Sequence, residues 1–252
     1  MPFDIEAVRA KAPAHKFYYF ESVGSTMVEA ARCVALDDPH GTVVLAEEQT
    51  AGIGRLGRTW ISESSVGIYG SVLLRLQLPP AQLPIASLLV GLAVAEAIEK
   101  VSGLACDLRW PNDVLIREKK ACGILTQLVD SCVIAGIGLN VSQKAFEAGL
   151  RTPATSLLLE SGGIVYSRES LVLALVEALD LFCQTLDEQG TDAILRAFAA
   201  RSSYVAGRRV RVEEGDLLGI TAGLDEYGFL QLRTDAGALM RLSAGGIRPV
   251  NE

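Results

Sequence analysis

Apolar residues recur along the chain in two patterns, short β-branched or aromatic runs and longer helical stretches, with turn-forming residues between them. Strands are predicted at 17–20, 42–46, 68–76, 107–110 continuing into 114–116, 123–129 and 132–141. Helices are predicted at 26–36 after an N-cap at Ser25, and at 83–101, 167–186 and 192–200. The connections between 107 and 141 are too short for parallel neighbours. The pattern therefore predicts an α/β (α+β) domain, with a mixed sheet flanked by helices.

The pattern changes from Gly207 onward. Short apolar stretches alternate with tight turns at Asp225–Gly228 and Asp235–Gly237, which predicts about five short strands and a small β-barrel. We therefore predict two domains, 1–205 and 206–252.

Composition narrows the function classes. The chain has 252 residues, and half of them are hydrophobic, which predicts a well-packed globular protein. Its net charge of −7 argues against a general affinity for nucleic acid. With only His15 and His40, a multi-histidine metal site or a Ser-His-Asp triad has little to draw on. The five cysteines are scattered and odd in number, which favours reduced thiols in the cytoplasm.

The same reading argues against export or membrane insertion. Met1–Lys16 carries charges throughout and lacks the apolar centre of a signal peptide. The most apolar run, Leu83–Ala95, is shorter than the roughly 20 residues that a membrane span needs. We expect a cytoplasmic protein with no membrane partner.

The first candidate for chemistry is the segment GIGRLGRTW, Gly52–Trp60. Its glycines fit the G-x-G-x-x-G pattern of dinucleotide-binding folds. No helical stripe follows, however, and the position about 20 residues further on, in Val72–Leu76, offers no carboxylate, so we reject that interpretation. Two interpretations stay open. Either the glycines let the backbone approach an anion that Arg55 and Arg58 bind, or the segment is a solvated basic turn anchored by Trp60.

The second candidate is RWPNDVLIREKKACGIL, Arg109–Leu125. Its Pro-Asn-Asp sequence is typical of a rigid turn, and an ordinary connection is the simplest interpretation. Lys120, however, leads directly into an apolar strand, so its ammonium group is expected at the strand edge. Asn112, Asp113 and Lys120 are therefore candidates for one polar pocket.

A third segment, AGIGLNV at Ala135–Val141, ends a strand with Gly136, Gly138 and Asn140. Glycine inside a strand marks close approach by a ligand or another backbone, or a bulge. The sequence leaves these interpretations open.

Together and in this order, these segments resemble those of the biotin protein ligases, the biotin–[acetyl-CoA-carboxylase] ligases. The resemblance runs from the Ser25-Thr26 turn through GIGRLGRTW, RWPND, KKACGIL and GIGLNV to the terminal barrel. It implies a mixed α/β catalytic domain followed by an SH3-like barrel. It also implies that ATP, with Mg²⁺, activates biotin to biotinyl-5′-AMP. A lysine of a biotin carboxyl carrier protein then accepts the biotinyl group, with no tightly bound metal.

The resemblance also implies roles for individual residues. Lys120 and Arg55 are expected to be catalytic by neutralising the two anions that must meet, and Asp113 is a candidate contact for Mg²⁺. The residues expected to bind biotin are Ser25, Thr26, Met27, Gln49, Gly52, Ile53, Gly54, Arg55, Lys120, Gly123 and Gly136. The residues expected to bind the nucleotide are Arg55, Arg58, Trp60, Asn112, Asp113, Lys120 and Asn140.

Three positions depart from the family pattern. Met27 stands where asparagine is usual, Ile53 replaces an arginine between the first two loop glycines, and Arg109 replaces a lysine. The first two bear on biotin affinity and loop ordering. The third keeps the charge but changes its hydrogen-bond geometry.

Two alternatives to a biotin ligase are a lipoate or octanoate ligase of the same fold and a non-catalytic biotin-binding relative. The arginine-containing glycine loop and the terminal barrel favour biotin, and the presence of Arg55, Lys120 and Asp113 favours catalysis. Only Met1–Lys16 precedes the first predicted strand, which leaves no room for an N-terminal DNA-binding domain. We expect no DNA binding, and an exposed sheet edge is compatible with a homodimer.

Overall fold

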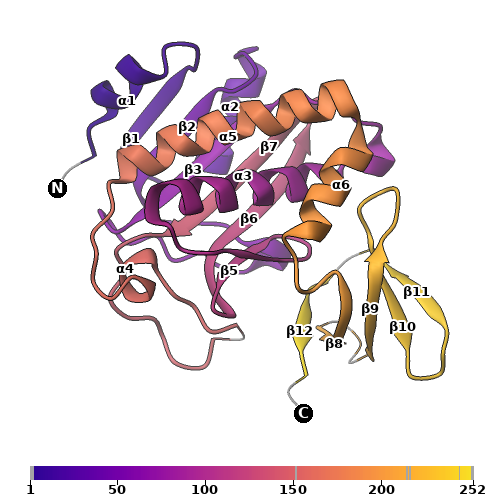
Figure 1. The fold of residues 1–252 in the computed structure, drawn as a ribbon. Coiled ribbons are helices and arrows are strands. Elements are labelled where there is room, and N and C mark those ends of the chain that lie inside the picture. Colours follow the sequence, from indigo (N-terminus) through magenta and orange to yellow (C-terminus); the bar gives the residue numbers. More distant parts are fainter. Residues whose placement is uncertain (1–2, 151, 214, 216, 244, 251–252) are drawn as a thin grey trace.

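The computed structural model describes residues 3–150, 152–213, 215, 217–243 and 245–250, and contains two sheets (Figure 1). The larger sheet consists of β1 (Phe17–Val23), β2 (Val43–Gln49), β3 (Gly67–Leu74), β4 (Asp107–Arg109), β5 (Asp113–Ile116), β6 (Lys119–Val129) and β7 (Cys132–Asn140). The smaller consists of β8 (Ala206–Val212), β9 (Leu218–Leu224), β10 (Leu230–Thr234), β11 (Leu239–Leu242) and β12 (Ile247–Pro249). The α-helices are α1 (Ile5–Lys11), α2 (Thr26–Ala35), α3 (Pro84–Ser102), α4 (Leu157–Glu160), α5 (Arg168–Gln189) and α6 (Thr191–Ala200).

The larger sheet is mixed, as predicted. Its strand order is β1-β2-β3-β7-β6-β5-β4. The β1–β2 pair is parallel because α2 carries the chain back between them, whereas the other neighbours are antiparallel. Turns or loops join these antiparallel neighbours, except β3 and β7, between which the chain runs through α3 and β4 to β6. This arrangement confirms the predicted α/β class.

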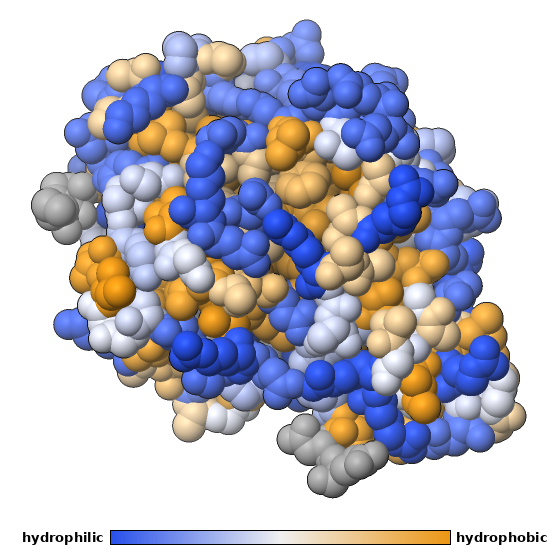
Figure 2. Space-filling view, viewed as in Figure 1, coloured by the Kyte–Doolittle hydropathy of each residue, from blue (hydrophilic) through white to orange (hydrophobic). Residues whose placement is uncertain are grey.

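Alternating side chains give this sheet two apolar faces. Val43 and Leu45 pack into the core that contains α3 and α5, whereas Val44 between them packs with Met27 and Ala30 of α2. The α3–α5 side is the larger core, and α3 is buried along most of its length beneath α5 and α6 (Figure 1). Figure 2 shows this helix-covered face, on which hydrophilic side chains predominate and hydrophobic ones emerge in smaller patches.

The smaller sheet is antiparallel throughout, in the order β11-β10-β9-β8-β12. It matches the predicted run of about five short strands. Buried contacts join it to the larger unit: Trp110 Nε1 donates a hydrogen bond to the carbonyl of Gly228 at 2.9 Å. Although β8 begins at Ala206, the division into domains 1–205 and 206–252 stays a prediction.

Several boundaries differ from the prediction. Strand β6 begins at Lys119, so the hairpin turn is only Arg117-Glu118, both with positive φ, and Lys120 lies inside the strand and not at its entrance. Helices α1 and α4 were not predicted because they are short, although Asp4 and Ser156 cap their N-termini. Among the described residues, no helix combines the length and apolar character required to cross a bilayer.

Candidate active site

Two adjoining cavities lie on the α2 side of the larger sheet, beneath the glycine loop that connects β2 to β3. The smaller has a volume of about 50 Å³ and the larger about 850 Å³. Both are lined by Gly54, Arg55, Trp60, Asn112 and Lys120. The glycine loop and the second basic segment therefore meet at the boundary between the cavities.

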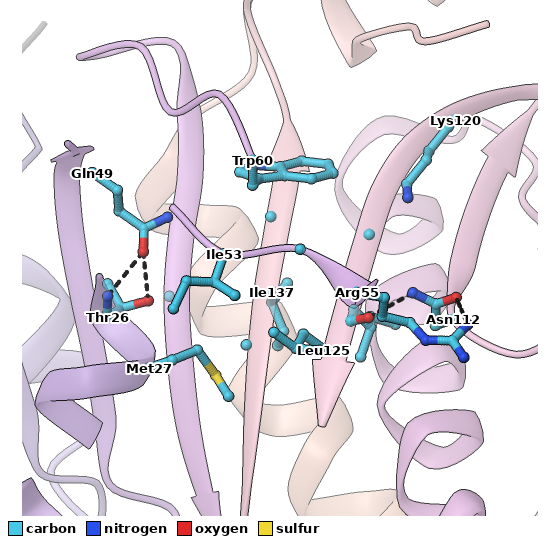
Figure 3. A pocket seen from close by; sticks show the side chains of 16 residues that line it. Thr26, Met27, Gln49, Ile53, Arg55, Trp60, Asn112, Lys120, Leu125 and Ile137 are labelled. Atoms are coloured by element: carbon cyan, nitrogen blue, oxygen red, sulfur yellow. Dashed lines mark hydrogen bonds between the residues drawn. The ribbon is translucent and has the colours of Figure 1, made fainter. Parts of the chain in front are cut away.

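One end of the smaller cavity is a neutral hydrogen-bonding site (Figure 3). The backbone N–H and hydroxyl of Thr26, at the start of α2, both donate to Gln49 Oε1, at 2.8 and 3.1 Å. Because the backbone N–H can only donate, it fixes the orientation of the Gln49 amide, whose Nε2 donates to Ser62 at 2.9 Å. Ser71 donates to the Thr26 hydroxyl at 2.8 Å. These bonds hold the amide rigidly.

Two glycines on neighbouring strands, Gly123 and Gly138, form a flat backbone surface beneath the loop, here called the Trp60 platform. Gly123 of β6 and Gly138 of β7 are direct cross-strand partners. A Cβ atom would lie 2.8 Å from the Trp60 ring at Gly123 and 2.3 Å from it at Gly138. Only glycine at both positions lets the indole lie against the strands, above Ile53 and Ile137 in Figure 3. The middle of the smaller cavity is consequently apolar.

The opposite end of the smaller cavity is cationic. Lys120 Nζ lies 2.5 Å from Asp113 Oδ1 and 5.4 Å from the centre of the Trp60 ring. Arg109 donates to the other carboxylate oxygen of Asp113 at 2.5 Å and to Thr152 at 2.8 Å. Burial would raise the pKa of Asp113, but Lys120 and Arg109 outweigh this and lower it. Asp113 therefore stays ionised and holds the lysine ammonium in place.

We expect Asp113→Asn to lower the free energy of unfolding by about 2 kcal/mol, because two cations then lose their counter-charge. Since the folded-state pKa of Asp113 is lowered, its contribution is present above the ordinary carboxyl pKa of about 4 and is lost as the pH falls through the folded-state value. Urea unfolding of both proteins checks this. The difference in free energy of unfolding between the two proteins should have its full value at neutral pH and shrink below about pH 4. A difference that does not change with pH would contradict the ion-pair explanation.

The glycine loop is folded back on itself over the cavities. Its internal hydrogen bonds run from Gly54 N to Arg58 O at 2.7 Å and from Trp60 N to Gly52 O at 2.9 Å. Arg55 Nη1 donates to Asn112 Oδ1 at 3.0 Å, and Asn112 Nδ2 donates to the carbonyl of Ile124 at 2.7 Å. Arg55 and Asn112, which were both expected to bind the nucleotide, are thus in direct contact.

Most of the predicted residues line these cavities. Those around the smaller cavity are Thr26, Met27, Gln49, Ile53, Gly54, Arg55, Trp60, Asn112, Lys120, Gly123 and Gly136. Arg58, Asp113 and Asn140 line the larger cavity. Ser25 and Gly52 line neither: the Ser25 side chain is buried at the start of α2, and Gly52 lies against the Trp60 carbonyl.

Three groups of lining residues were not predicted from the sequence. Gly138 was noted only as part of a glycine pair, although the Gly-x-Gly spacing on one strand face signals a second bare position. Phe146 and Leu150 give the larger cavity an apolar wall, and their segment was assigned no role. Glu213 and Gly245 come from the connections that flank β8 and β12 of the C-terminal sheet, and no local signal points to that contact.

A resident metal site is not formed by the described residues, in which no group of three or more His, Cys, Asp or Glu side chains gathers. Both oxygens of Asp113 contact cationic side chains. Its proposed contact with Mg²⁺ therefore stays a prediction, and would require the ion to compete with Lys120 or Arg109.

This arrangement suits a particular pair of ligands. An amide-lined end, an apolar middle and a cationic end fit an elongated molecule with a polar head, an apolar body and an anionic tail. The adjoining larger cavity carries Arg58 and shares Arg55 and Lys120, so a phosphate-bearing molecule can meet that tail there. Cys122 is buried, and burial raises the pKa of its thiol far above neutral, so it offers no thiolate nucleophile. The geometry favours direct reaction between two bound anions.

Comparison with known proteins points to the same kind of site. Residues 20–142 match the Biotin/lipoate A/B protein ligase family and residues 205–247 match the Biotin protein ligase C terminal domain. The chain is 35% identical over 234 residues to the bifunctional ligase/repressor BirA of Bacillus spizizenii, covering 87% of this chain and 70% of that protein. It is 34% identical over 232 residues to the biotin–[acetyl-CoA-carboxylase] ligase of Mycobacterium tuberculosis, covering 89% and 85%. The solved biotin protein ligase of Aquifex aeolicus in complex with biotin and ATP superimposes with a TM-score of 0.80 at 29% identity, covering 93% of this chain and 99% of that one. The chain therefore belongs to the biotin/lipoate A/B protein ligase family and, within it, to the biotin protein ligases.

Proposed function

We propose that this protein is an ATP-dependent biotin–protein ligase that forms biotinyl-5′-AMP and transfers the biotinyl group to a carrier lysine. The observation that carries the proposal is the convergence of Lys120 and Arg55 on the boundary shared by an amide-lined cavity and a larger one. An acyl-adenylate has its mixed anhydride at such a boundary. The substrates are inferred from the family to which the chain belongs, and the geometry of the two cavities supports their arrangement.

In this proposal, biotin occupies the smaller cavity. Its ureido group, which both donates and accepts hydrogen bonds, lies near Thr26 and Gln49. Its thioether ring and aliphatic chain lie in the apolar middle, near Ile53. The carboxylate then reaches Lys120, whose positive charge offsets the cost of holding an anion beside apolar side chains.

ATP, with its Mg²⁺, occupies the larger cavity. A biotin carboxylate oxygen attacks the α-phosphorus, the new P–O bond forms, and pyrophosphate leaves with the electron pair of the broken bond. Lys120 and Arg55 neutralise charge that builds up between the two anions, while Arg58 contributes to phosphate binding. The carrier lysine, as a free amine, then attacks the acyl carbon, and AMP leaves.

The glycine loop has a clear purpose in such a reaction. The mixed anhydride is labile in water, so a loop that covers the boundary between the cavities keeps the intermediate for transfer. Trp60, lying on Gly123 and Gly138, closes one side of that boundary.

The function is tested by ATP–pyrophosphate exchange with biotin and with lipoate as alternative acids. We expect biotin-dependent exchange, and little exchange with lipoate, because the amide-lined end matches a ureido group and not a dithiolane ring. The second step, transfer to the carrier, is measured by the intact mass of a carboxyl carrier domain after incubation with ATP, Mg²⁺ and biotin. Exchange with lipoate alone would favour the alternative ligase, and binding of biotin without exchange would favour a non-catalytic protein.

Finer parts of the proposal need their own measurements. We propose that the carrier is a biotin carboxyl carrier protein or domain and that the reaction takes place in the cytoplasm. Absence of DNA binding, absence of a membrane partner, absence of a tightly bound metal and homodimer formation all stay predictions. A gel shift with sequence-specific retention would contradict the first.

A further inference from the structure

Two arginines of the glycine loop reach across to the C-terminal sheet. Arg55 Nη1 donates to the carbonyl of Gly245 at 3.1 Å, in addition to its bond with Asn112. Arg58 Nη2 donates to Glu213 Oε2 at 3.2 Å. The short turn Arg55–Gly57 at the loop tip is therefore held at both sides by residues that flank strands of the C-terminal sheet, Glu213 directly after β8 and Gly245 between β11 and β12.

This turn depends on such support. Leu56 has φ 58° and ψ 34°, in the left-handed region that branched side chains seldom adopt. Its side chain is exposed and contributes no core burial that would compensate. Backbone hydrogen bonds from Gly54 N to Arg58 O and from Arg58 N to Arg55 O close the turn, at 2.7 and 3.2 Å. The side-chain contacts of Arg55 and Arg58 then tie the closed turn to the C-terminal domain.

Glu213 is itself a fixed anchor. Arg248 donates from both Nε and Nη2 to Glu213 Oε1, each at 2.9 Å, and the Glu213 backbone N–H donates to Gly246 at 2.8 Å. Burial would raise the pKa of Glu213, but Arg248 and Arg58 outweigh it and lower the pKa, so the group is ionised at neutral pH. Its second oxygen is thus a stationary acceptor for the loop arginine.

We propose that Glu213 is a positioning residue that latches the glycine loop over the two cavities, so that the C-terminal domain sets how long the acyl-adenylate stays bound. The inference rests on the proposed function. Glu213 acts through Arg58 and the loop, so it governs release of the intermediate and not the attack on phosphorus. Opening of the latch would let the labile intermediate escape before a carrier lysine arrives.

The test uses the full chain loaded with radiolabelled biotin and Mg²⁺-ATP, followed by rapid gel filtration to measure loss of bound adenylate. We expect Glu213→Gln to release it about fivefold faster, equivalent to about 1 kcal/mol at 1.4 kcal/mol per tenfold change. At saturating biotin and ATP, where weaker ATP binding does not limit the rate, single-turnover adenylate formation should change less than release does, since Lys120 and Arg55 are untouched. Wild-type protein that forms no adenylate would contradict the proposed function and not the latch.

Two further variants make the result specific. Asp235→Asn removes an exposed ion pair with Arg209 on the same sheet, away from the loop, and should leave release unchanged. Arg58→Gln combined with Glu213→Gln should release no faster than the faster single variant, because both break one contact. Unchanged release in Glu213→Gln, equal acceleration in Asp235→Asn, or additive effects in the double variant would each overturn the latch.

Discussion

Replacement of Lys120 by alanine is expected to slow formation of the biotinyl adenylate by about a thousandfold, close to 4 kcal/mol in activation free energy. Its ammonium group lies where the two cavities join, fixed by Asp113 at 2.5 Å. Without Lys120, only Arg55 of the two residues assigned to catalysis is left to offset the repulsion between the biotin carboxylate and the α-phosphate. A single-turnover assay of adenylate formation at saturating biotin and ATP measures the effect.

The matched control is Lys119→Ala, one residue earlier on β6. Successive side chains of a strand point to opposite faces, and Lys119 contacts Glu160 at 3.0 Å, away from the cavities. We expect this variant to retain adenylate formation within about twofold. The loss of stability should be small, because Lys119 is half-exposed and the buried Glu160 keeps its contacts with Arg117 and Thr155. Near wild-type turnover in Lys120→Ala, or equal losses in both variants, would remove Lys120 from its assigned role.

The sequence was sufficient for features that depend on local pattern. Strand alternation and helix caps predicted nearly every element, because the residues that form the apolar faces are close together along the chain. The motifs also predicted that Arg55, Asn112 and Lys120 share a site, and they line both cavities. That prediction needed the family resemblance, since each segment alone had an equally good interpretation as a turn.

Contacts between segments that are far apart along the chain could not be predicted from the sequence. Asp113 is a candidate contact for the Mg²⁺ of ATP, and that contact stays a prediction. The ion pairs of its two oxygens with Lys120 and Arg109 were not predicted from the sequence. Whether a carboxylate meets a cation or a metal depends on strand register, and a bulge between Val114 and Leu115 shifts it here. The contact between Glu213 and the glycine loop is likewise set by domain packing.

Gly138→Ala is expected to weaken binding of biotin and ATP by about a hundredfold, although the substitution adds one methyl group. The new Cβ would lie 2.3 Å from the Trp60 indole, a distance that carbon atoms do not tolerate. The ring is rigid, so it must lift from the platform and take the loop with it. Overpacking of this kind costs about 1–3 kcal/mol, and the upper value corresponds to about a hundredfold. Isothermal titration with biotin and with a non-hydrolysable ATP analogue measures it.

Gly136→Ala is the comparison that isolates the cause. It lies two residues earlier on the same face of β7, but its Cβ would meet the sulfur of Met27 at 2.7 Å, at the far end of a flexible side chain that can rotate away. We therefore expect a loss of about tenfold or less there, and thermal melting close to wild type for both variants. If Gly136→Ala were the more damaging, or if Gly138→Ala lowered the melting temperature in proportion to its loss of affinity, general sheet disruption would explain the result. The Trp60 platform would then have no specific part in holding the loop closed.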